Sequence, residues 1–281
     1  FFFDMLLNKK IGIQGVRGSF HHEVATAYFS SNAPLNEYLS FDSLAEGLQK
    51  EEIAYAIMAI ENSIAGSIIP NYALIDQCNL QIIGEHYLSI HHNLMALKEQ
   101  SIDQIKEVRS HPMALLQCKQ FFMQHPHIRL VETADTAQEA QKIAENKTYG
   151  IAAIASQQAA ELYSLSIVAP SIQTIQNNVT RFVVIQKEKS QILEEKINKA
   201  ALKFILDHQR GSLAAVLNMM SDCLLNLTKI QSLPVIETPG KYAFFVDVTF
   251  DSYAQYDKAK SILKIMASEF KILGEYTKQD Q

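Results

Sequence analysis

The stretch NNVTRFVVIQ, residues 177–186, predicts a buried strand with a polar entrance. Its apolar, β-branched run ending at Ile185 is typical of a strand that is covered on both faces. Thr180 and Arg181 stand at the start of this run, directly after two asparagines and a valine. Because α/β proteins keep their ligand sites at the ends of buried strands, we expect chemistry at this entrance.

The segments around this strand predict two α/β lobes. Short apolar runs such as IGIQ (11–14) and IAYAIMAI (53–60) alternate with helical patterns, which indicates βα units and mostly parallel sheets. HYLSIHHNLMAL (86–97) breaks this rhythm, because it alternates polar and apolar residues like a strand. We interpret 86–97 as a crossing between lobes and Thr180–Gln186 as the return crossing, with a cleft between the lobes.

Three helix starts carry recognisable signals. Asp42 is expected to cap the helix that follows YLSF, and Asp135 with Gln138 has the form of a capping box. In SHPMALLQC (110–118), Ser110 is expected as N-cap and Pro112 falls in the first turn.

The C-terminal third predicts a separate module. The charged stretch KEKSQILEEKINK (187–199) is interpreted as a linker. The pattern that follows is strand, helix, strand, strand, helix, strand, which is the ferredoxin-like βαββαβ order. The turn ETPG (237–240) is expected to join the two middle strands into a hairpin.

Composition excludes several classes of function. The 281 residues are 48% hydrophobic with a net charge of −5, so the chain can bury a sizeable core, and it has no basic stripe to bind nucleic acid. No apolar run approaches the roughly 20 residues that span a membrane, and the start FFFDMLLNKK has the reverse order of a signal peptide. Three widely spaced cysteines predict reduced thiols in the cytoplasm, and no histidine has zinc-site spacing, so no metal is expected.

Three motifs carry candidate site residues. GVRGSF (15–20), with Ser19, places backbone N–H groups at a helix start, which favours an anion, although a plain βα turn has the same pattern. IENSIAGS (60–67) brings Glu61, Asn62 and Ser63 to a strand end, where such a triplet also caps helices. Gln117 lies two helical turns after Ser110, so both are expected near one face.

Taken in order, GVRGSFHHEVA, ENSIAGS, SHPMALLQC and NNVTRFVV resemble the prephenate dehydratase family over residues 11 to about 186. Val16 replaces a usual proline, and Met113 stands where glutamine is common. The resemblance implies an α/β catalytic domain at 10–187 with two lobes, about 10–85 plus 168–187 and 86–167, like a type II periplasmic binding protein. It also implies that 198–277 is a ferredoxin-like ACT regulatory domain.

The resemblance implies conversion of prephenate to phenylpyruvate, with loss of CO2 and water, in phenylalanine biosynthesis. Aromatisation drives this reaction, so no cofactor is expected. By family analogy, Thr180 assists the departing hydroxyl as a neutral donor, while Glu61, Asn62 and Gln117 orient the substrate or relay a proton. The expected substrate-binding residues are Ser19, Ser63, Ser110, Asn178 and Arg181. Arg181 has an alternative role as an ion-pair partner between the lobes.

In the C-terminal module, QRGSLAAVL (209–217) resembles the family's effector loop, which implies that Gly211, Ser212 and Leu213 contact L-phenylalanine as an allosteric effector. QSLP (231–234) stands where Glu-Ser-Arg-Pro is usual, so Ser232 and Pro234 remain of the second effector motif. A homodimer or homotetramer is expected, and the alternative for the module is dimerisation alone.

Two alternatives to this function stay open. Arogenate dehydratase differs only in a substrate that carries an amino group instead of the keto oxygen, and no residue decides between the two. A non-catalytic two-lobed small-molecule-binding protein needs the anion donors, but it has no use for Thr180 as a proton donor.

Overall fold

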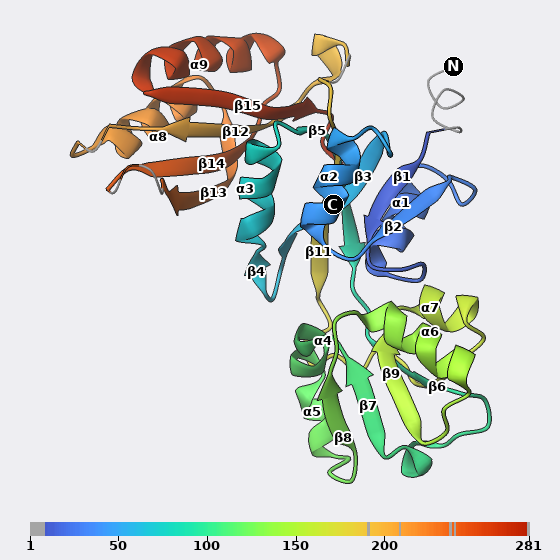
Figure 1. The fold of residues 1–281 in the computed structure, drawn as a ribbon. Coiled ribbons are helices and arrows are strands. Elements are labelled where there is room, and N and C mark those ends of the chain that lie inside the picture. Colours follow the sequence, from blue (N-terminus) through green and yellow to red (C-terminus); the bar gives the residue numbers. More distant parts are fainter. Residues whose placement is uncertain (1–8, 190–191, 208, 236–237, 239, 280–281) are drawn as a thin grey trace. The chain divides into compact units, whose positions relative to one another are not determined.

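The computed structural model describes residues 9–189, 192–207, 209–235, 238 and 240–279. The chain forms two compact units, each of which is considered by itself below (Figure 1). The first holds the described residues up to Asn71 together with His86–Phe182, and the second holds Tyr72–Glu85 and the described residues from Val183 onward. Among the helices that the structure describes, none combines the length and apolar character needed to cross a membrane.

In the first unit, one sheet has three parallel strands in the order β2-β1-β3. These are β1 (Ile11–Gln14), β2 (Leu35–Tyr38) and β3 (Tyr55–Asn62), with the short β4 (Gly66–Ser67) folded back on the end of β3 and helices α1 (Phe20–Tyr28) and α2 (Phe41–Gln49) following β1 and β2. The prediction that Asp42 caps α2 was wrong. Ser40 is the N-cap instead: it has an extended backbone, its Oγ accepts from Ser43 N, and its own N–H donates to Ser43 Oγ. Asp42 therefore lies within the first turn of the helix.

The second sheet of this unit has the order β10-β6-β9-β7-β8 and carries helices on both faces (Figure 1). Alternate residues of one strand face opposite layers, so Ala152 and Ile154 pack with α4 and α5, whereas Ala153 and Ala155 pack with α6 and α7. The elements are β6 (Asn93–Ala96), β7 (Glu107–Ser110), β8 (Arg129–Glu132), β9 (Ile151–Ala155), β10 (Ser166–Ala169), the 3-10 turn η1 (Ile102–Gln104), α4 (Pro112–Gln117), α5 (Lys119–Met123), α6 (Thr136–Asn146) and α7 (Gln157–Leu162).

Two chain segments pass between these sheets: the crossing within 86–97 is confirmed, whereas the return lies at 170–178, before the predicted Thr180–Gln186, which belongs to β11 itself. One runs from β5 (Gln81–Ser89) into β6, and the other runs from β10 into β11 (Val179–Gln186). The segments are hydrogen-bonded to each other, because Ile90 N donates to Asn178 O at 2.7 Å and Ile172 N donates to His92 O at 2.8 Å. The chain therefore changes sheets twice at one place.

The second unit confirms the predicted βαββαβ order. Its antiparallel strands lie in the order β13-β14-β12-β15, and both helices contribute to one core on a single face of the sheet. The elements are β12 (Lys199–Ile205), α8 (Ser212–Asp222), β13 (Asn226–Pro234), β14 (Tyr242–Thr249), α9 (Tyr253–Met266) and β15 (Glu269–Tyr276). The expected turn ETPG includes Glu237 and Pro239, which lie outside the described residues, although β13 and β14 pair as a hairpin would.

The predicted linker ends earlier than expected. Residues 190 and 191 lie outside the described residues, and the described part contains the 3-10 turn η2 (Glu194–Lys196). Lys199 already belongs to β12, is buried, and donates to both carboxylate oxygens of Glu85 at 2.9 and 2.8 Å. A buried ion pair gives the same charged composition as a solvated linker, so the sequence pattern was misleading here.

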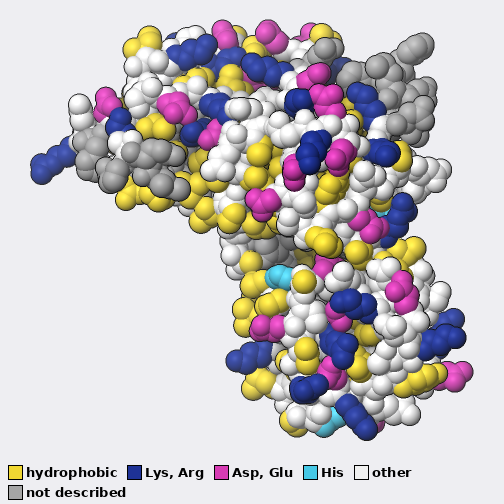
Figure 2. Space-filling model, viewed as in Figure 1, with side chains coloured by type: hydrophobic (Ala, Val, Ile, Leu, Met, Phe, Trp, Pro, Cys, Tyr) yellow, Lys and Arg dark blue, Asp and Glu magenta, His cyan; other side chains and the backbone are white. Residues whose placement is uncertain are grey.

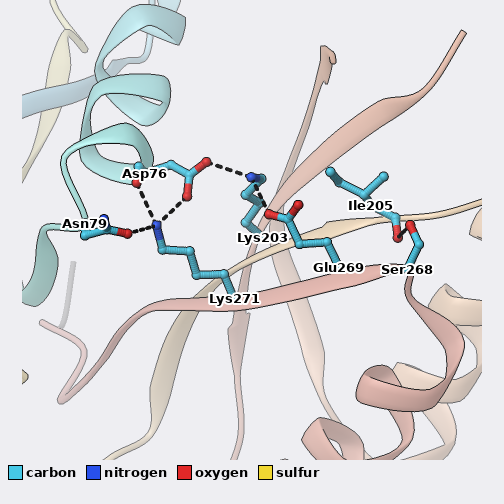
Figure 3. A network of polar contacts seen from close by, with 7 residues as sticks. All are labelled: Asp76, Asn79, Lys203, Ile205, Ser268, Glu269 and Lys271. Atoms are coloured by element: carbon cyan, nitrogen blue, oxygen red, sulfur yellow. Dashed lines mark hydrogen bonds and ion pairs between the residues drawn. The ribbon is translucent and has the colours of Figure 1, made fainter. Parts of the chain in front are cut away.

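On the other face of this sheet, two lysines of its strands form ion pairs with an aspartate at the end of α3 (Ile69–Gln77) (Figure 3). The Asp76 carboxylate forms ion pairs with Lys203 Nζ and Lys271 Nζ, each at 2.7 Å. Lys271 Nζ also donates to the Asp76 carbonyl and to Asn79 Oδ1, at 2.6 and 2.7 Å. An ammonium group at a helix C-terminus satisfies free carbonyls and complements the helix dipole, so this network stabilises the end of α3.

The described surface carries both signs of charge. On the face drawn in Figure 2, Lys and Arg side chains are interspersed with Asp and Glu side chains over each unit.

Candidate active site

A pocket of about 430 Å³ lies in the first unit, at the carboxyl ends of β1 and β3 and at the start of β11. Gln14 ends β1, Asn62 ends β3, and Thr180 lies at the start of β11. The pocket is lined by Gln14, Ser19, Phe20, His21, Phe41, Ala59, Asn62, Ala65, Ile68, Ile90, His92, His111, Met113, Ala114, Gln117, Ala134, Asp135, Thr136, Thr180 and Phe182. Three phenylalanines provide apolar walls. The polar groups of the lining are mostly amides, hydroxyls and imidazoles.

The starts of three helices reach this pocket. Ser19 is the N-cap of α1, His111 is the N-cap of α4, and Asp135 is the N-cap of α6, and all three line the pocket. Backbone N–H groups at helix starts bind anions. The start of α6 is already occupied by the Asp135 carboxylate, which accepts from Gln138 N. Because the lining residues include no lysine or arginine, the other helix starts and the side-chain donors are the features that would hold a carboxylate.

Five side chains form a hydrogen-bonded chain along the pocket, which we call the amide relay. Asn62 Nδ2 lies 2.9 Å from Thr180 Oγ1 and 2.7 Å from Asn178 Oδ1. Asn178 Nδ2 lies 3.0 Å from Gln117 Oε1. His92 Nε2 lies 2.8 Å from the same Gln117 oxygen. The relay joins residues that are 25 to 118 positions apart in the sequence.

Two backbone N–H groups fix the direction of the relay at one end. Ile64 N and Ala65 N both donate to Asn62 Oδ1, at 3.0 and 2.8 Å. This identifies the other terminal atom of Asn62 as the NH2 group, which must donate to its two neighbours. Asn178 Oδ1 and Thr180 Oγ1 are therefore acceptors.

The direction then carries through to the other end. Because Asn178 accepts through its oxygen, its Nδ2 donates to Gln117 Oε1. Gln117 Oε1 is an acceptor, so His92 must donate through Nε2–H and carries a lone pair on Nδ1 when neutral. The Gln117 NH2 group has no partner among the described residues and remains a donor for a ligand.

The relay leaves the Thr180 proton available. Thr180 is 7% exposed, lines the pocket and accepts from Asn62. The structure gives its hydroxyl proton no acceptor among the described residues. A hydroxyl that accepts one hydrogen bond becomes a better donor of the next, so the proton is placed to serve a group bound in the pocket.

The imidazoles of His21 and His92 are neutral at physiological pH. Burial lowers the pKa of His21 to about 3. Burial also lowers the pKa of His92; the hydrogen bond to Gln117 opposes this shift, and the His91 charge adds to it. His92 Nδ1 is buried without a hydrogen-bond partner among the described residues, which costs about 1–3 kcal/mol.

Burial raises the pKa of the Asp135 carboxyl, while hydrogen bonds from the backbone N–H groups of α6 oppose the shift. Among the described residues, no group of three or more His, Cys, Asp or Glu side chains is placed to hold a metal ion. The described cysteines, Cys78, Cys118 and Cys223, form no disulfide.

Three of the expected site residues near the strand ends do not line the pocket. Thr180 and Phe182 do, and side chains alternate along a strand, so Arg181 between them points to the opposite face of β11. Glu61 is partly buried on β3 and is not a lining residue, and Asn178 is buried within the relay behind the lining. Roles for Arg181 and Asn178 in substrate binding and for Glu61 in catalysis stay predictions.

Two expected serines also lie outside the lining. The exposed Ser63 accepts a hydrogen bond from Val179 N at 2.9 Å, which ties the end of β3 to β11. Ser110 is not the N-cap of α4, because the chain is still in β7 there and its buried hydroxyl donates to Ile154 O. His111 takes the cap, accepting a backbone N–H two residues later. The substrate-binding roles of the two serines remain predictions.

The sequence interpretation missed six polar residues of the pocket: Gln14, His21, His92, His111, Asp135 and Thr136. Gln14 ends a strand and was detectable by the same rule that selected Asn62. His92 offered no local signal, because its partner Gln117 lies on another segment. His111 stood beside the residue to which the cap was assigned.

The predicted effector loop of the second unit lines a small hollow of about 100 Å³. Ser212 and Leu213 in the first turn of α8 form one side of it, and Tyr242 and Phe244 of β14 form another. Gly211 is the N-cap of α8.

Ser232 and Pro234 lie next to this hollow on the neighbouring strand. In the ladder between β13 and β14, Ser232 pairs with Phe244 and Pro234 pairs with Tyr242. Both predicted effector segments therefore meet at one end of the module.

Comparison with known proteins identifies the group to which the chain is related. The sequence model of the prephenate dehydratase family matches residues 11–190. An Arabidopsis thaliana protein named arogenate dehydratase/prephenate dehydratase 2, chloroplastic, is 34% identical over 283 residues, which cover 95% of this chain and 72% of that protein.

Two solved structures share the fold. The prephenate dehydratase of Staphylococcus aureus is 26% identical with a TM-score of 0.82, covering 95% of this chain and 100% of that one. The Arthrobacter aurescens prephenate dehydratase, solved in complex with L-Phe, is 23% identical with a TM-score of 0.86, covering 95% and 89% of the two chains. With the family match over residues 11–190 and a relative that is 34% identical over 95% of this chain, this chain belongs to the prephenate dehydratase family.

Proposed function

We propose that this protein converts prephenate to phenylpyruvate, CO2 and water, through the pocket of the first unit. The observation that carries the proposal is the Thr180 hydroxyl, which lines the pocket, accepts from Asn62 and keeps its own proton for a ligand. Family membership supplies the reaction class, and the geometry supplies a donor where that reaction needs one.

The chemistry requires no electron sink beyond the substrate ring. The bond from the ring to its carboxylate breaks and releases CO2, and the electron pair enters the ring. The C4–O bond breaks, and the oxygen leaves with its electron pair and takes up a proton to become water. The ring becomes aromatic, which supplies the driving force.

Each part of the pocket has a role in this reaction. The helix start at Ser19 and the free NH2 group of Gln117 would hold the two carboxylates. Thr180 donates a hydrogen bond to the departing oxygen as charge develops on it. A threonine is too weak an acid to ionise, so its effect is that of a positioned dipole in a site with little water.

The domain assignment follows from this proposal. We infer a catalytic domain at 10–187, with lobes of about 10–85 plus 168–187 and 86–167, and an ACT regulatory domain at 198–277. Because the relative from Arabidopsis thaliana is named for arogenate as well as prephenate, arogenate is the second candidate substrate. Free cysteines that are far apart support a cytoplasmic location.

Regulation by L-phenylalanine is proposed at the hollow formed by Ser212, Leu213, Tyr242 and Phe244, with Ser232 and Pro234 beside it. The Arthrobacter aurescens structure, which holds L-Phe, supports an amino-acid effector for this fold. A homodimer or homotetramer is the proposed assembly.

The test compares wild type, Thr180→Val and Thr180→Ser, with phenylpyruvate formation followed from prephenate and phenylalanine formation followed from arogenate. Loss of the donor in Thr180→Val is expected to lower kcat about 10²–10³-fold. Thr180→Ser retains the hydroxyl and should keep most of the activity. A folded Thr180→Val variant with near wild-type kcat would refute the proposed role, and faster consumption of arogenate would change the substrate. Adding L-phenylalanine to the same assay tests regulation through the module.

A further inference from the structure

His92 is held firmly at the place where the chain changes sheets. Its backbone N donates to Gln173 Oε1 at 3.0 Å, and its backbone O accepts from Ile172 N at 2.8 Å. Its ring meets Phe20 edge-on, with 5.8 Å between ring centroids, and the residue is 4% exposed. The two backbone bonds therefore fix the main chain of His92 between the crossing segments, and burial against Phe20 confines its ring.

The same ring keeps one nitrogen in an unfavourable position. His92 Nδ1 is buried and has no hydrogen-bond partner among the described residues, whereas most buried polar atoms in proteins are paired. A hydrocarbon ring at this position would avoid that cost. What histidine provides and a hydrocarbon ring cannot is the hydrogen bond from Nε2–H to Gln117 Oε1, at 2.8 Å.

That donor decides how the Gln117 amide is oriented. Gln117 Oε1 accepts from both His92 and Asn178. If the amide turned over, its NH2 group would face two donors and lose both bonds, so the observed orientation is strongly favoured. Without His92, only the bond from Asn178 would favour it. The turned Gln117 amide would present its oxygen to a ligand, and its NH2 group would face the NH2 group of Asn178. If Asn178 turned over to accept from Gln117, its own NH2 group would then face the NH2 group of Asn62.

We propose that His92 is a positioning residue for the dehydration, which holds Gln117 through Nε2–H and thereby keeps the Gln117 NH2 group turned toward a ligand in the pocket. The proposal rests on the function proposed above. It assigns His92 no hydrogen bond to the substrate: the ring lines the pocket, but Nδ1 is buried and Nε2–H is taken by Gln117. The effect on the site is an NH2 group of Gln117 that stays turned toward a dianionic ligand, while the orientation of Asn62 and Thr180 is fixed separately by the N–H groups of Ile64 and Ala65.

Three substitutions separate the donor from the shape of the ring. His92→Gln places an amide NH2 close to the position of Nε2, His92→Asn is too short to reach Gln117, and His92→Phe keeps a ring without a donor. We expect His92→Gln to retain kcat within about threefold. His92→Asn and His92→Phe should lose about tenfold or more, the effect of one hydrogen bond on a transition state. His92→Phe should unfold at the same temperature as wild type or higher, because the unpaired nitrogen is gone.

A double-mutant cycle adds a readout that a purely structural histidine would not move. Gln117→Leu alone removes the group that His92 holds, so His92→Phe with Gln117→Leu should be no slower than the slower single variant. Multiplicative losses in the double variant would contradict a shared role. Equal impairment of His92→Gln and His92→Phe, or a folded His92→Phe with wild-type kcat, would overturn the proposal.

The tautomer is measured without substrate, which separates this inference from the proposed function. In wild-type protein labelled with ¹⁵N-histidine, long-range ¹H–¹⁵N correlation spectra assigned with His92→Gln should show a neutral imidazole with its proton on Nε2. A proton on Nδ1 or an imidazolium at neutral pH would overturn the proposal. If the tautomer is as expected but wild type consumes neither prephenate nor arogenate, the proposed function fails, and the claim that His92 serves dehydration fails with it.

Discussion

Replacing Asn62 by aspartate should reverse the hydrogen bonding at the centre of the relay with almost no change of shape. The new carboxylate would still accept from the N–H groups of Ile64 and Ala65, which hold Oδ1 in wild type. The variant would lack the NH2 group that now donates to Asn178 Oδ1 at 2.7 Å and Thr180 Oγ1 at 2.9 Å. An oxygen would instead stand opposite two oxygens.

The expected loss of activity follows from the Thr180 hydroxyl. With a carboxylate beside it, the hydroxyl turns its proton toward that carboxylate and withdraws it from the substrate. Removal of one such donor lowers kcat about 10²–10³-fold, which corresponds to roughly 2.7–4 kcal/mol of transition-state stabilisation. KM should also rise, because the new negative charge lies in a pocket that binds a dianion.

Asn71→Asp provides a matched control in the same unit. Asn71 is also buried, and its Nδ2 donates to Ala59 O at 2.6 Å, but it does not line the pocket. This variant should lose stability and retain kcat. Steady-state rates of phenylpyruvate formation and urea unfolding of both variants make the comparison. The reasoning is refuted if folded Asn62→Asp keeps kcat within about threefold, or if both variants lose kcat equally.

Two further changes test the framework around the site. Burial alone would raise the pKa of the Asp76 carboxyl, but its two lysine partners outweigh burial and lower this pKa. The ionised carboxylate therefore stabilises the folded state above the unfolded pKa, and this contribution is lost as the pH falls through the folded pKa. Asp76→Asn should therefore lower the free energy of unfolding at pH 7 by about 2 kcal/mol, with the difference shrinking below about pH 4; an equal difference at pH 3 in urea titrations would contradict this. Gly18 has φ +87° and an added Cβ would lie 2.9 Å from Ala159 Cα, so Gly18→Ala should destabilise by about 2–4 kcal/mol. Gly66→Ala, also at positive φ but in open space, should lose about half as much or less in the same denaturant assay, and equal losses would exclude the clash as the cause.

Much of the architecture could be predicted from local patterns. The alternation of apolar runs and helical periods was sufficient for the βα units, for the change of sheets before β6 and for the βαββαβ module, while the return between sheets lies at 170–178 instead of the predicted Thr180–Gln186. The helix starts were less secure, since Ser40 and His111 took the caps expected at Asp42 and Ser110. Several polar residues near a helix start have similar capping propensities, and the backbone geometry chooses among them.

The candidate site was predicted in part. Thr180, Asn62, Gln117 and Ser19 line the pocket, whereas the other expected catalytic and substrate-binding residues do not: Glu61, Ser63, Ser110, Asn178 and Arg181. For Arg181 the alternation of side chains along a strand already gave the answer once Thr180 was assigned to the cleft. For the others, nothing in the local sequence said which way the side chain would face.

By itself the sequence determined which residues lie at strand ends and helix starts, because period and capping chemistry act over a few neighbouring residues. Only the tertiary structure decided that His92, Gln117, Asn178, Asn62 and Thr180 form one directed chain of hydrogen bonds. Hydrogen bonds form only at contact distance and in fixed directions, and these five side chains come from four separate segments. Their order along the chain of amino acids therefore carries no information about which of them donates and which accepts.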